Sequence, residues 1–443
     1  MANATGPGTH LPVAPIRRLT RPFVSFLEIE SASGVVLLIC TAVALVLANS
    51  SFSHVYHDFW HTPVRITLGN VHIGGDLGHF VINDVLMTIF FFVVGLEIKR
   101  EIVAGELRDP RKAALPVAAA FGGMVVPAGV YMAFQAGHVG EPSFRGWGVP
   151  MATDIAFVVG VMALLGKRVP FGLKILLLSL AIADDIGAVI VIAAFYTSGL
   201  DVAMLGLAAL GFVLTYVLNR VGVRAISVYV LIGMLIWLAV YQSGIHPTVA
   251  GVMLGLMTPP SAWVGRDALR LSLMDVVTRI ENPDSDPGNG ELAVLAFAAR
   301  ESVSPLERLE HGLHPWVGFV IMPLFALANA GVHLELGAIT EAVSIATAVA
   351  LVVGKPVGVV LFSLLAVRLG LARLPQGVNV PVLLAGGCLA GIGFTMSLFV
   401  AGLAFDGHPI LLADAKIGVM LGSTCSALLG STLLLLTLKR QRA

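Results

Sequence analysis

The chain has 443 residues, of which 57% are hydrophobic and only 12% are charged. Soluble domains carry about 25% charged residues, so this composition indicates a polytopic membrane protein. Basic and acidic residues number 27 each, and a formal net charge of zero argues against nucleic acid as a partner. The three cysteines, Cys40, Cys388 and Cys425, lie in apolar runs at unrelated spacings, which indicates neither a disulfide framework nor a metal site.

Apolar runs recur along the chain at lengths that suit helices crossing a bilayer, which need about 20 mostly apolar residues. They predict an all-α polytopic membrane protein whose transmembrane domain, 32–438, holds about twelve helices. An N-terminal segment, 1–31, and a tail, 439–443, flank this domain. The predicted spans are 32–50, 80–103, 112–136, 149–166, 171–196, 201–221, 226–243, 246–259, 314–333, 343–368, 380–405 and 411–438.

The basic residues test this division into spans. If the N-terminus is cytoplasmic, nearly all lysines and arginines fall on the cytoplasmic side. External loops then receive only Arg65 and Arg145, with Lys416 near a boundary. This bias follows the positive-inside rule and predicts an even number of spans with both termini in the cytoplasm.

Two loops differ from ordinary connections. The first external loop contains VRITLGNVHIG (64–74), in which two short runs of β-formers flank Gly-Asn, and it predicts a hairpin. The cytoplasmic stretch 260–313 includes a polar, turn-rich segment, 281–291, that we expect to lack regular structure. The segment that follows it, 291–311, has a helical pattern.

Two adjacent aspartates, Asp184 and Asp185, lie near the middle of the apolar run from Phe171 to Tyr196. A charged carboxylate at that depth costs at least about 2.5 kcal/mol, and two side by side repel each other. We therefore expect the pair to bind a cation, a proton, or each in turn.

A third intramembrane aspartate, Asp154, follows a proline in GVPMATDIAFVVG (148–160). Pro150 interrupts helical hydrogen bonding, and Thr153 and Asp154 are good N-caps for a helix that resumes at Ile155. The stretch is either a capped kink or a discontinuous helix whose unwound backbone and Thr153 oxygen line an ion site. The cost of an unpaired aspartate at this depth favours the second interpretation.

One lysine, Lys355, lies in ALVVGKPVGVVLFSLL (350–365), too deep to reach an interface easily. It needs a counter-charge, and one of the three aspartates is the obvious partner. The result is either a structural ion pair or a lysine that gains and loses a proton as its partner binds a cation. Three carboxylates and one ammonium leave surplus negative charge for a monovalent cation or protons.

The predicted span 380–405 contains the glycine-rich sequence GGCLAGIGFTMS (386–397). Its glycines allow close helix packing, or they mark a second break. Paired interrupted segments in the two halves of a chain indicate a transporter site near mid-membrane, a rule that counts the family named below among its own examples. The four glycines are Gly386, Gly387, Gly391 and Gly393.

Eight stretches, in order along nearly the whole chain, resemble the NhaA family of bacterial sodium/proton antiporters. They are INDVLMTIFFFVVGLEIKRE (82–101), PMATDIAFVVG (150–160), LAIADDIGAVI (180–190), SGIHPTVAGVMLG (243–255), LEHGLHPW (309–316), PLFALANAGV (323–332), VGKPVGV (353–359) and GIGFTMSLF (391–399).

The resemblance implies an electrogenic antiporter of the bacterial inner membrane that expels Na+ or Li+ in exchange for a larger number of protons. It implies two discontinuous crossing helices, inverted-repeat architecture and no cofactor, since Na+, Li+ and protons are transported substrates. Asp185 would be the central cation and proton carrier, and Asp184 a neighbour able to pair with Lys355. Thr153 and Asp154 would lie where the broken helices cross, with Asp154 and Lys355 offsetting the helix dipole ends.

The resemblance also implies a pH-response region at a cytoplasmic funnel. A carboxylate–histidine cluster titrates in the physiological range, although an ordinary solvated cluster at the membrane edge is an equal alternative. His246 matches a family position too, as a sensor or as a structural histidine at a helix start. The hairpin 64–74 would form a homodimer contact, and the loop at roughly 260–309 is longer than in the enterobacterial pattern. The funnel residues are Glu97, Arg100, Glu101, Glu310, His311 and His314.

Our hypothesis is antiport in which Na+ and protons compete for one site. Three other classes of membrane protein are alternatives. An ion-coupled symporter would need polar or aromatic groups for an organic solute, and few lie near the break. An intramembrane aspartyl protease needs facing aspartates on separate helices, whereas Asp184 and Asp185 diverge by about 100° on one helix. A retinal photoreceptor with a Schiff base on Lys355 fits poorly with twelve spans and a proline beside the lysine.

Overall fold

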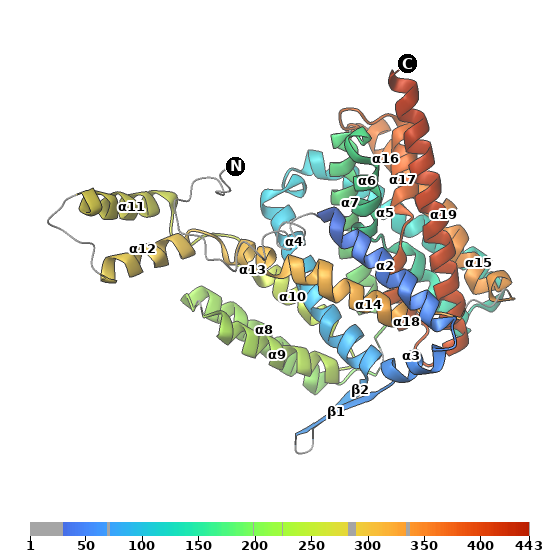
Figure 1. Ribbon diagram of the computed structural model, residues 1–443, viewed down its shortest axis with the longest axis horizontal. Helices are drawn as coiled ribbons and strands as arrows, with labels where there is room; N and C mark the ends of the chain where they lie inside the picture. Colours follow the sequence, from blue (N-terminus) through green and yellow to red (C-terminus); the bar gives the residue numbers. More distant parts are fainter. Residues whose placement is uncertain are drawn as a thin grey trace.

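The computed structural model describes residues 30–68, 71–197, 199–223, 225–281, 289–333 and 337–442, and most of them are helical (Figure 1). Nearly all of the N-terminal segment 1–31, the Gly-Asn of the predicted hairpin and residues 282–288 of the polar stretch lie outside the described residues. The first helices are α2 (Glu30–Ala48), α3 (Ser53–Trp60), η1 (Leu77–Leu86), α4 (Met87–Ala104), η2 (Glu106–Arg108), α5 (Pro110–Phe134), η3 (Ala136–His138), η4 (Pro142–Met151), α6 (Ile155–Leu165), η5 (Gly166–Arg168), α7 (Phe171–Phe195), α8 (Val202–Val221), α9 (Ile226–Gln242) and α10 (Thr248–Met257).

The second part of the chain has the same character. Its helices are α11 (Arg266–Glu281), α12 (Asn289–Glu301), α13 (Pro305–Trp316), η6 (Val317–Ile321), α14 (Met322–Asn329), η7 (Gly337–Thr340), α15 (Ala342–Val349), η8 (Ala350–Gly354), α16 (Lys355–Arg368), α17 (Val380–Ala390), α18 (Phe394–Ala404) and α19 (Pro409–Arg442).

Seven helices of the described chain are long and apolar enough to cross a membrane, or up to ten if each of three bent pairs counts as one span. Two shorter apolar helices, α9 and α10, accompany them. The protein is therefore an all-α polytopic membrane protein, as its composition predicts. The number of twelve spans stays a prediction.

Two of the bent pairs are broken where the sequence suggests interruptions. η4 and α6 meet at 41°, and α17 and α18 at 47°. The breaks touch each other, because the Asp154 N–H donates to the Ile392 carbonyl at 2.7 Å. A side chain at Gly393 would bring its Cβ within 3.0 Å of the Ala152 carbonyl, so this glycine permits the close approach.

Several boundaries differ from those predicted. The span expected at 314–333 begins earlier, at Pro305, because Ser304 and Glu307 form a capping box in front of α13. The span 411–438 extends to Arg442 in α19, into the predicted tail. The stretch 260–313 also holds more helix than the flank alone suggests: α11 ends at Glu281, the first residue of the polar segment, and α12 takes in residues 289–291 of that segment.

The hairpin predicted at 64–74 corresponds to two antiparallel strands, β1 (Pro63–Leu68) and β2 (Val71–Asp76). They pair from Pro63 with Asp76 to Leu68 with Val71. The hairpin projects from the bundle at the end opposite the C-terminus (Figure 1). The Tyr241 hydroxyl at the end of α9 donates to the Gly74 carbonyl at 3.4 Å, which ties α9 to the base of the hairpin.

Candidate ion-binding site

The aspartate pair lies on α7, where both side chains are shielded from solvent: Asp184 is 0% exposed and Asp185 is 3% exposed. Asp184 Oδ2 accepts a hydrogen bond from Lys355 Nζ at 2.5 Å and lies 2.7 Å from Thr153 Oγ1. The counter-charge that Lys355 requires is thus Asp184. In the described chain the structure brings α7, the first helix break and the start of α16 together at this carboxylate.

Each aspartate of the pair keeps one oxygen without a partner. Asp184 Oδ1 and Asp185 Oδ1 are buried and have no hydrogen-bond partner among the described residues. Buried polar atoms are nearly always hydrogen-bonded, so two such oxygens on consecutive residues require an explanation. Carboxylate oxygens bind hard cations and protons, which makes the pair chemically suited to either.

Lys355 is fully buried at the first position of α16. Its ammonium also donates to the carbonyl of Met151, the last residue of η4. A helix ends in unpaired carbonyls that carry partial negative charge, so a cation there is stabilised. Lys355 therefore compensates both a carboxylate and the end of a broken helix.

Asp154 is 1% exposed and joins the two breaks. Its Oδ1 accepts from the Phe157 N–H at 3.1 Å, which makes it the N-cap of α6. Its Oδ2 accepts from the Thr395 N–H at 3.0 Å and from the Thr395 hydroxyl. One carboxylate thus satisfies the starts of α6 and α18, so Asp154 is a cap and a bridge between the two interrupted helices.

Thr153 has two possible acceptors for one hydroxyl proton. Its Oγ1 lies 2.7 Å from Asp184 Oδ2 and 2.9 Å from the carbonyl of Ala390, the last residue of α17. A hydroxyl donates one proton at a time. Thr153 can therefore turn its proton towards the carboxylate or towards the helix end as the charge on Asp184 changes.

The residues predicted to respond to pH are only partly together. Arg100 Nη1 forms a salt bridge with Glu310 Oε1, and His314 Nε2 lies 4.0 Å from Glu97 Oε1. Glu101 accepts from the Glu106 N–H at 3.2 Å. His311 faces elsewhere: its exposed ring lies 2.8 Å from the Glu307 carbonyl through Nδ1.

His246 belongs to a different group of residues. Its Nε2 lies 3.6 Å from Asp84 Oδ1, and its Nδ1 lies 2.7 Å from Thr248 Oγ1. On the other side of the Asp84 carboxylate, His79 Nδ1 lies 3.5 Å from Oδ2. His246 therefore does not join the Arg100–Glu310 cluster.

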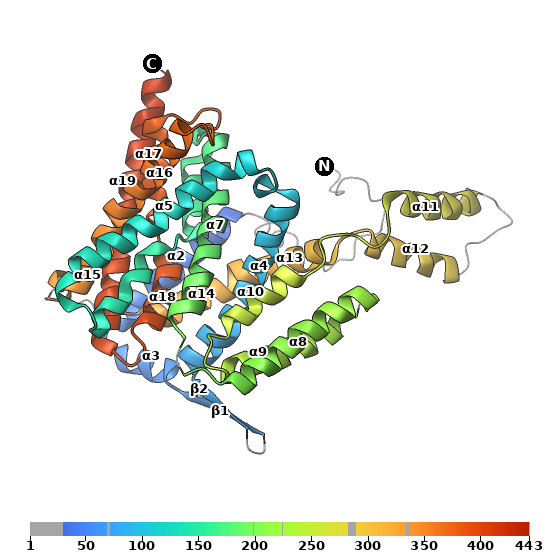
Figure 2. The ribbon, with the colours of Figure 1, turned by 180° about the vertical axis from the view of Figure 1, so that it is seen from behind.

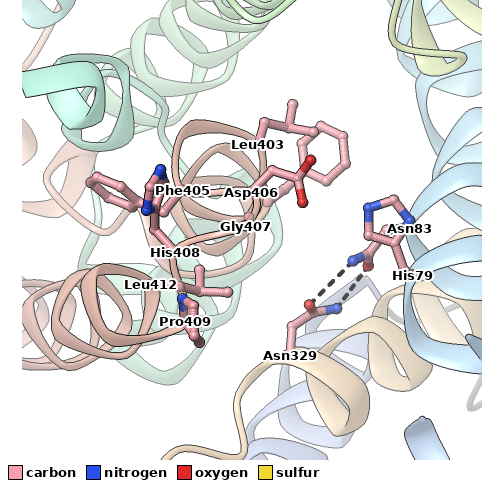
Figure 3. A pocket seen from close by; sticks show the side chains of 12 residues that line it. His79, Asn83, Asn329, Leu403, Phe405, Asp406, Gly407, His408, Pro409 and Leu412 are labelled. Carbon is pink, nitrogen blue, oxygen red and sulfur yellow. Dashed lines mark hydrogen bonds between the residues drawn. The ribbon is translucent and has the colours of Figure 1, made fainter. Parts of the chain in front are cut away.

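A cavity of about 290 Å³ opens beside His79 (Figure 3). Its lining includes Asp406 and His408 from the turn between α18 and α19. Asn83 and Asn329 close one side through mutual amide hydrogen bonds of 2.9 and 3.4 Å. None of the aspartates at the helix breaks lines this cavity, so it is separate from the aspartate site.

Three groups at the site were not predicted from the sequence. Thr395 lies in the glycine-rich motif, and a break recognised there would have drawn attention to the first hydroxyl after it. The carbonyls of Met151 and Ala390 carry no signal in the sequence, because they matter only through the meeting of two chain breaks.

The fold is a bundle of apolar helices in which two helices are interrupted at the same place, and a buried lysine–aspartate group lies there. These features define a multi-pass membrane protein with an intramembrane ionic site. Comparison with known proteins then assigns the family. The family model described as "Na+/H+ antiporter 1" matches residues 24–434. A protein of Rhodopirellula baltica named "Na(+)/H(+) antiporter NhaA" is 52% identical over 433 residues, 97% of each chain. Its namesake from Rhizobium meliloti is 49% identical over 441 residues, covering 98% of this chain and 99% of the relative.

The chain belongs to the Na+/H+ antiporter 1 family, as the eight motifs predict. Membership supports sodium/proton antiport and implies a transporter rather than an enzyme.

Proposed function

We propose that this protein is an electrogenic antiporter of the bacterial inner membrane that expels Na+ or Li+ and admits a larger number of protons. The observation that carries the proposal is the pair of buried carboxylate oxygens without partners on Asp184 and Asp185, next to the Lys355 ammonium. The family supports Na+ and H+ as substrates.

The mechanism is competition at one site. With the site open to the cytoplasm, Na+ binds the aspartate pair and displaces protons. Asp185, whose Oδ1 has no donor, is the central carrier. Binding of Na+ to Asp184 weakens its bond to Lys355, and Thr153 can then donate to Ala390 instead. After reorientation, external protons displace the ion, and coupling follows because both cannot be bound at once.

The two broken helices are the proposed elements that move when the site reorients. They cross as spans of an inverted-repeat architecture, and the contact of Asp154 with the start of α18 supports this. The two shorter helices α9 and α10, added to the ten possible spans, would complete twelve. Both termini would then be cytoplasmic.

Two further roles rest on the family resemblance. Glu97, Arg100, Glu101, Glu310 and the nearby histidines would tune the pH response at the cytoplasmic mouth, and their partial clustering supports this for Arg100 and Glu310. The hairpin, projecting from the bundle, would join two copies into a homodimer. His246, which lies beside Asp84 and apart from that cluster, would be a separate pH-response residue.

The test is the collapse of a pH gradient in everted vesicles on adding Na+, Li+ or K+ across a pH series. Na+ and Li+ should collapse the gradient, and K+ should not. The collapse should be faster when the membrane potential favours the net charge movement. A Na+ response that ignores the membrane potential would contradict electrogenic exchange.

The alternative is an ion-coupled symporter of an organic solute with the same architecture. Solute uptake by proteoliposomes driven by a Na+ gradient distinguishes the two. The buried groups that meet at the helix breaks are carboxylates, a lysine and small hydroxyls, which offer little for a larger ligand and favour antiport.

A further inference from the structure

The helices α11 and α12 form a hairpin that stands apart from the helix bundle (Figure 1; Figure 2). Its base is fixed to α13. The Trp263 and Val264 N–H groups both donate to the Glu301 carbonyl at 3.1 Å, and Arg308 Nη1 lies 3.2 Å from Glu301 Oε1. The direction of the hairpin is therefore set by hydrogen bonds and an ion pair.

The hairpin leaves and rejoins the bundle at the level where apolar helices end. The carbonyl of Met257, the last residue of α10, accepts from the Asn219 amide of α8 at 3.4 Å. The Leu306 N–H at the start of α13 donates to the Pro259 carbonyl at 3.3 Å. Since α8 is long and apolar enough to span, this level marks the edge of the apolar slab.

Three large apolar side chains of α12 are uncovered within the described chain. Leu292, Val294 and Phe297 are 45%, 60% and 54% exposed. Ala298 is buried, as is Val276 on α11. In both ribbon views α12 lies on the side of the hairpin nearer to α8 and α9 (Figure 1; Figure 2). The uncovered side chains of α12 thus lie on the helix of the pair that is nearer the apolar slab.

The other helix, α11, exposes apolar side chains too: Leu271, Leu273, Met274 and Val277 are 69%, 43%, 55% and 48% exposed. Its charged side chains Arg266, Asp267, Arg270 and Asp275 are exposed. A helix pair that exposes both apolar and charged side chains at the level of the bilayer edge fits an interface between lipid and water. Acidic residues outnumber basic ones in 260–304, so attraction to anionic lipid does not hold the hairpin there.

We propose that α12 is an interfacial helix that lies on the bilayer surface at the side where α8 and α9 are joined, with Val294 and Phe297 inserted among the lipids and α11 covering it from water. Its anchoring fixes the start of α13 through the Glu301–Arg308 pair. α13 also carries Glu310, the partner of Arg100. The hairpin therefore links the lipid surface to the charged cluster at the end of α4.

The test uses the full-length protein in phosphatidylcholine nanodiscs, with its three native cysteines replaced by serine and its Na+/H+ exchange verified. Nitroxide labels are placed at F297C on α12 and at D267C on α11. Collision with oxygen, which concentrates in lipid, is compared with collision with a water-soluble nickel chelate.

The label at position 297 should collide several-fold more with oxygen than with the chelate, and the label at 267 should do the reverse. Neither ratio should change with anionic lipid or high salt, because the contact is apolar. Adding V294E should move the ratio at 297 towards the aqueous value. Equal chelate access at both positions would overturn the proposal. So would a label at 297 shielded from both reagents with spin–spin broadening, which would instead indicate contact between two copies of the chain.

Discussion

Two clusters of polar and charged side chains in the described chain differ in what surrounds them. The buried cluster, Thr153, Asp154, Asp184, Asp185 and Lys355, is no more than 3% exposed. The edge cluster consists of Glu97, Arg100, Glu310 and His314.

In the buried cluster, backbone groups at the ends of interrupted helices complete the bonds of Asp154, Thr153 and Lys355. In the edge cluster, Arg100 and His314 keep 45% and 53% of their side chains exposed. Water solvates those charges and weakens the ion pairs that they form. The comparison suggests that the buried cluster decides whether exchange occurs, while the edge cluster adjusts its pH dependence.

The largest effect is expected from Asp185→Asn. An amide holds neither the proton nor the charge that attracts Na+, so Na+-driven pH changes in everted vesicles should be abolished. D267N, on the exposed α11, is the matched control and should leave exchange unchanged. The thermal unfolding of both variants should stay close to that of the wild type. Undiminished exchange by a folded Asp185→Asn protein would remove the carrier role.

We expect Lys355→Met mainly to lower the free energy of unfolding. It leaves Asp184 without its counter-charge at a site with no solvent exposure, and breaking a buried pair costs about 3–5 kcal/mol. The loss should be largest at neutral pH and smaller at low pH, where Asp184 takes up a proton. Thermal unfolding in detergent across a pH series measures it. Lys355→Arg, which keeps the charge, is the control, and equal losses in both variants would point to packing instead.

Asp154→Asn should have an intermediate effect. It removes the negative charge from two helix starts, which contributes about 0.3–2 kcal/mol, yet it keeps an oxygen that can accept. Exchange should be slower but present. Asp154→Ala should lose more, because the Phe157 and Thr395 N–H groups become unsatisfied, at about 1–3 kcal/mol each. Thermal unfolding and vesicle exchange rank the two, and the reverse order would contradict the bridging role.

The smallest effect on stability is expected from Glu310→Gln. Its partner Arg100 is half in water, so the loss should be about 1 kcal/mol or less. The pH profile of exchange should shift, while the maximal rate stays close to that of the wild type. D267N, on the exposed α11 and outside the pH-response set, is again the control. Identical pH profiles for both variants and the wild type would assign the edge cluster no regulatory role.

Much of the fold followed from chemistry that is local in the sequence. Apolar runs predicted α7 within one residue of its observed end, and Pro150 with Asp154 predicted the start of α6 at Ile155. Capping and periodicity act over a few residues, so the sequence carries them directly. The early start of α13 could also have been found, because Ser304 and Glu307 have the spacing of a capping box.

The rest depends on contacts between distant parts of the chain. The choice of Asp184 over Asp185 as the partner of Lys355 is set by how α7 and α16 face each other, and residue types alone leave it open. The division between His246 and the edge cluster is likewise a matter of position in space. The second proton acceptor of Thr153 exists only because two breaks meet at Ala390.

The most direct test of the central claim is Na+ binding to the purified protein at several pH values, with the released protons counted. If Na+ and protons share the aspartate pair, Na+ binding should release protons, because the ligands must be deprotonated. The apparent Kd should then rise about tenfold for each displaced proton per unit of falling pH. In Asp185→Asn both the binding and the release should be lost. A Na+ affinity that is the same at every pH, with no proton released by a protein that still exchanges, would contradict a shared site.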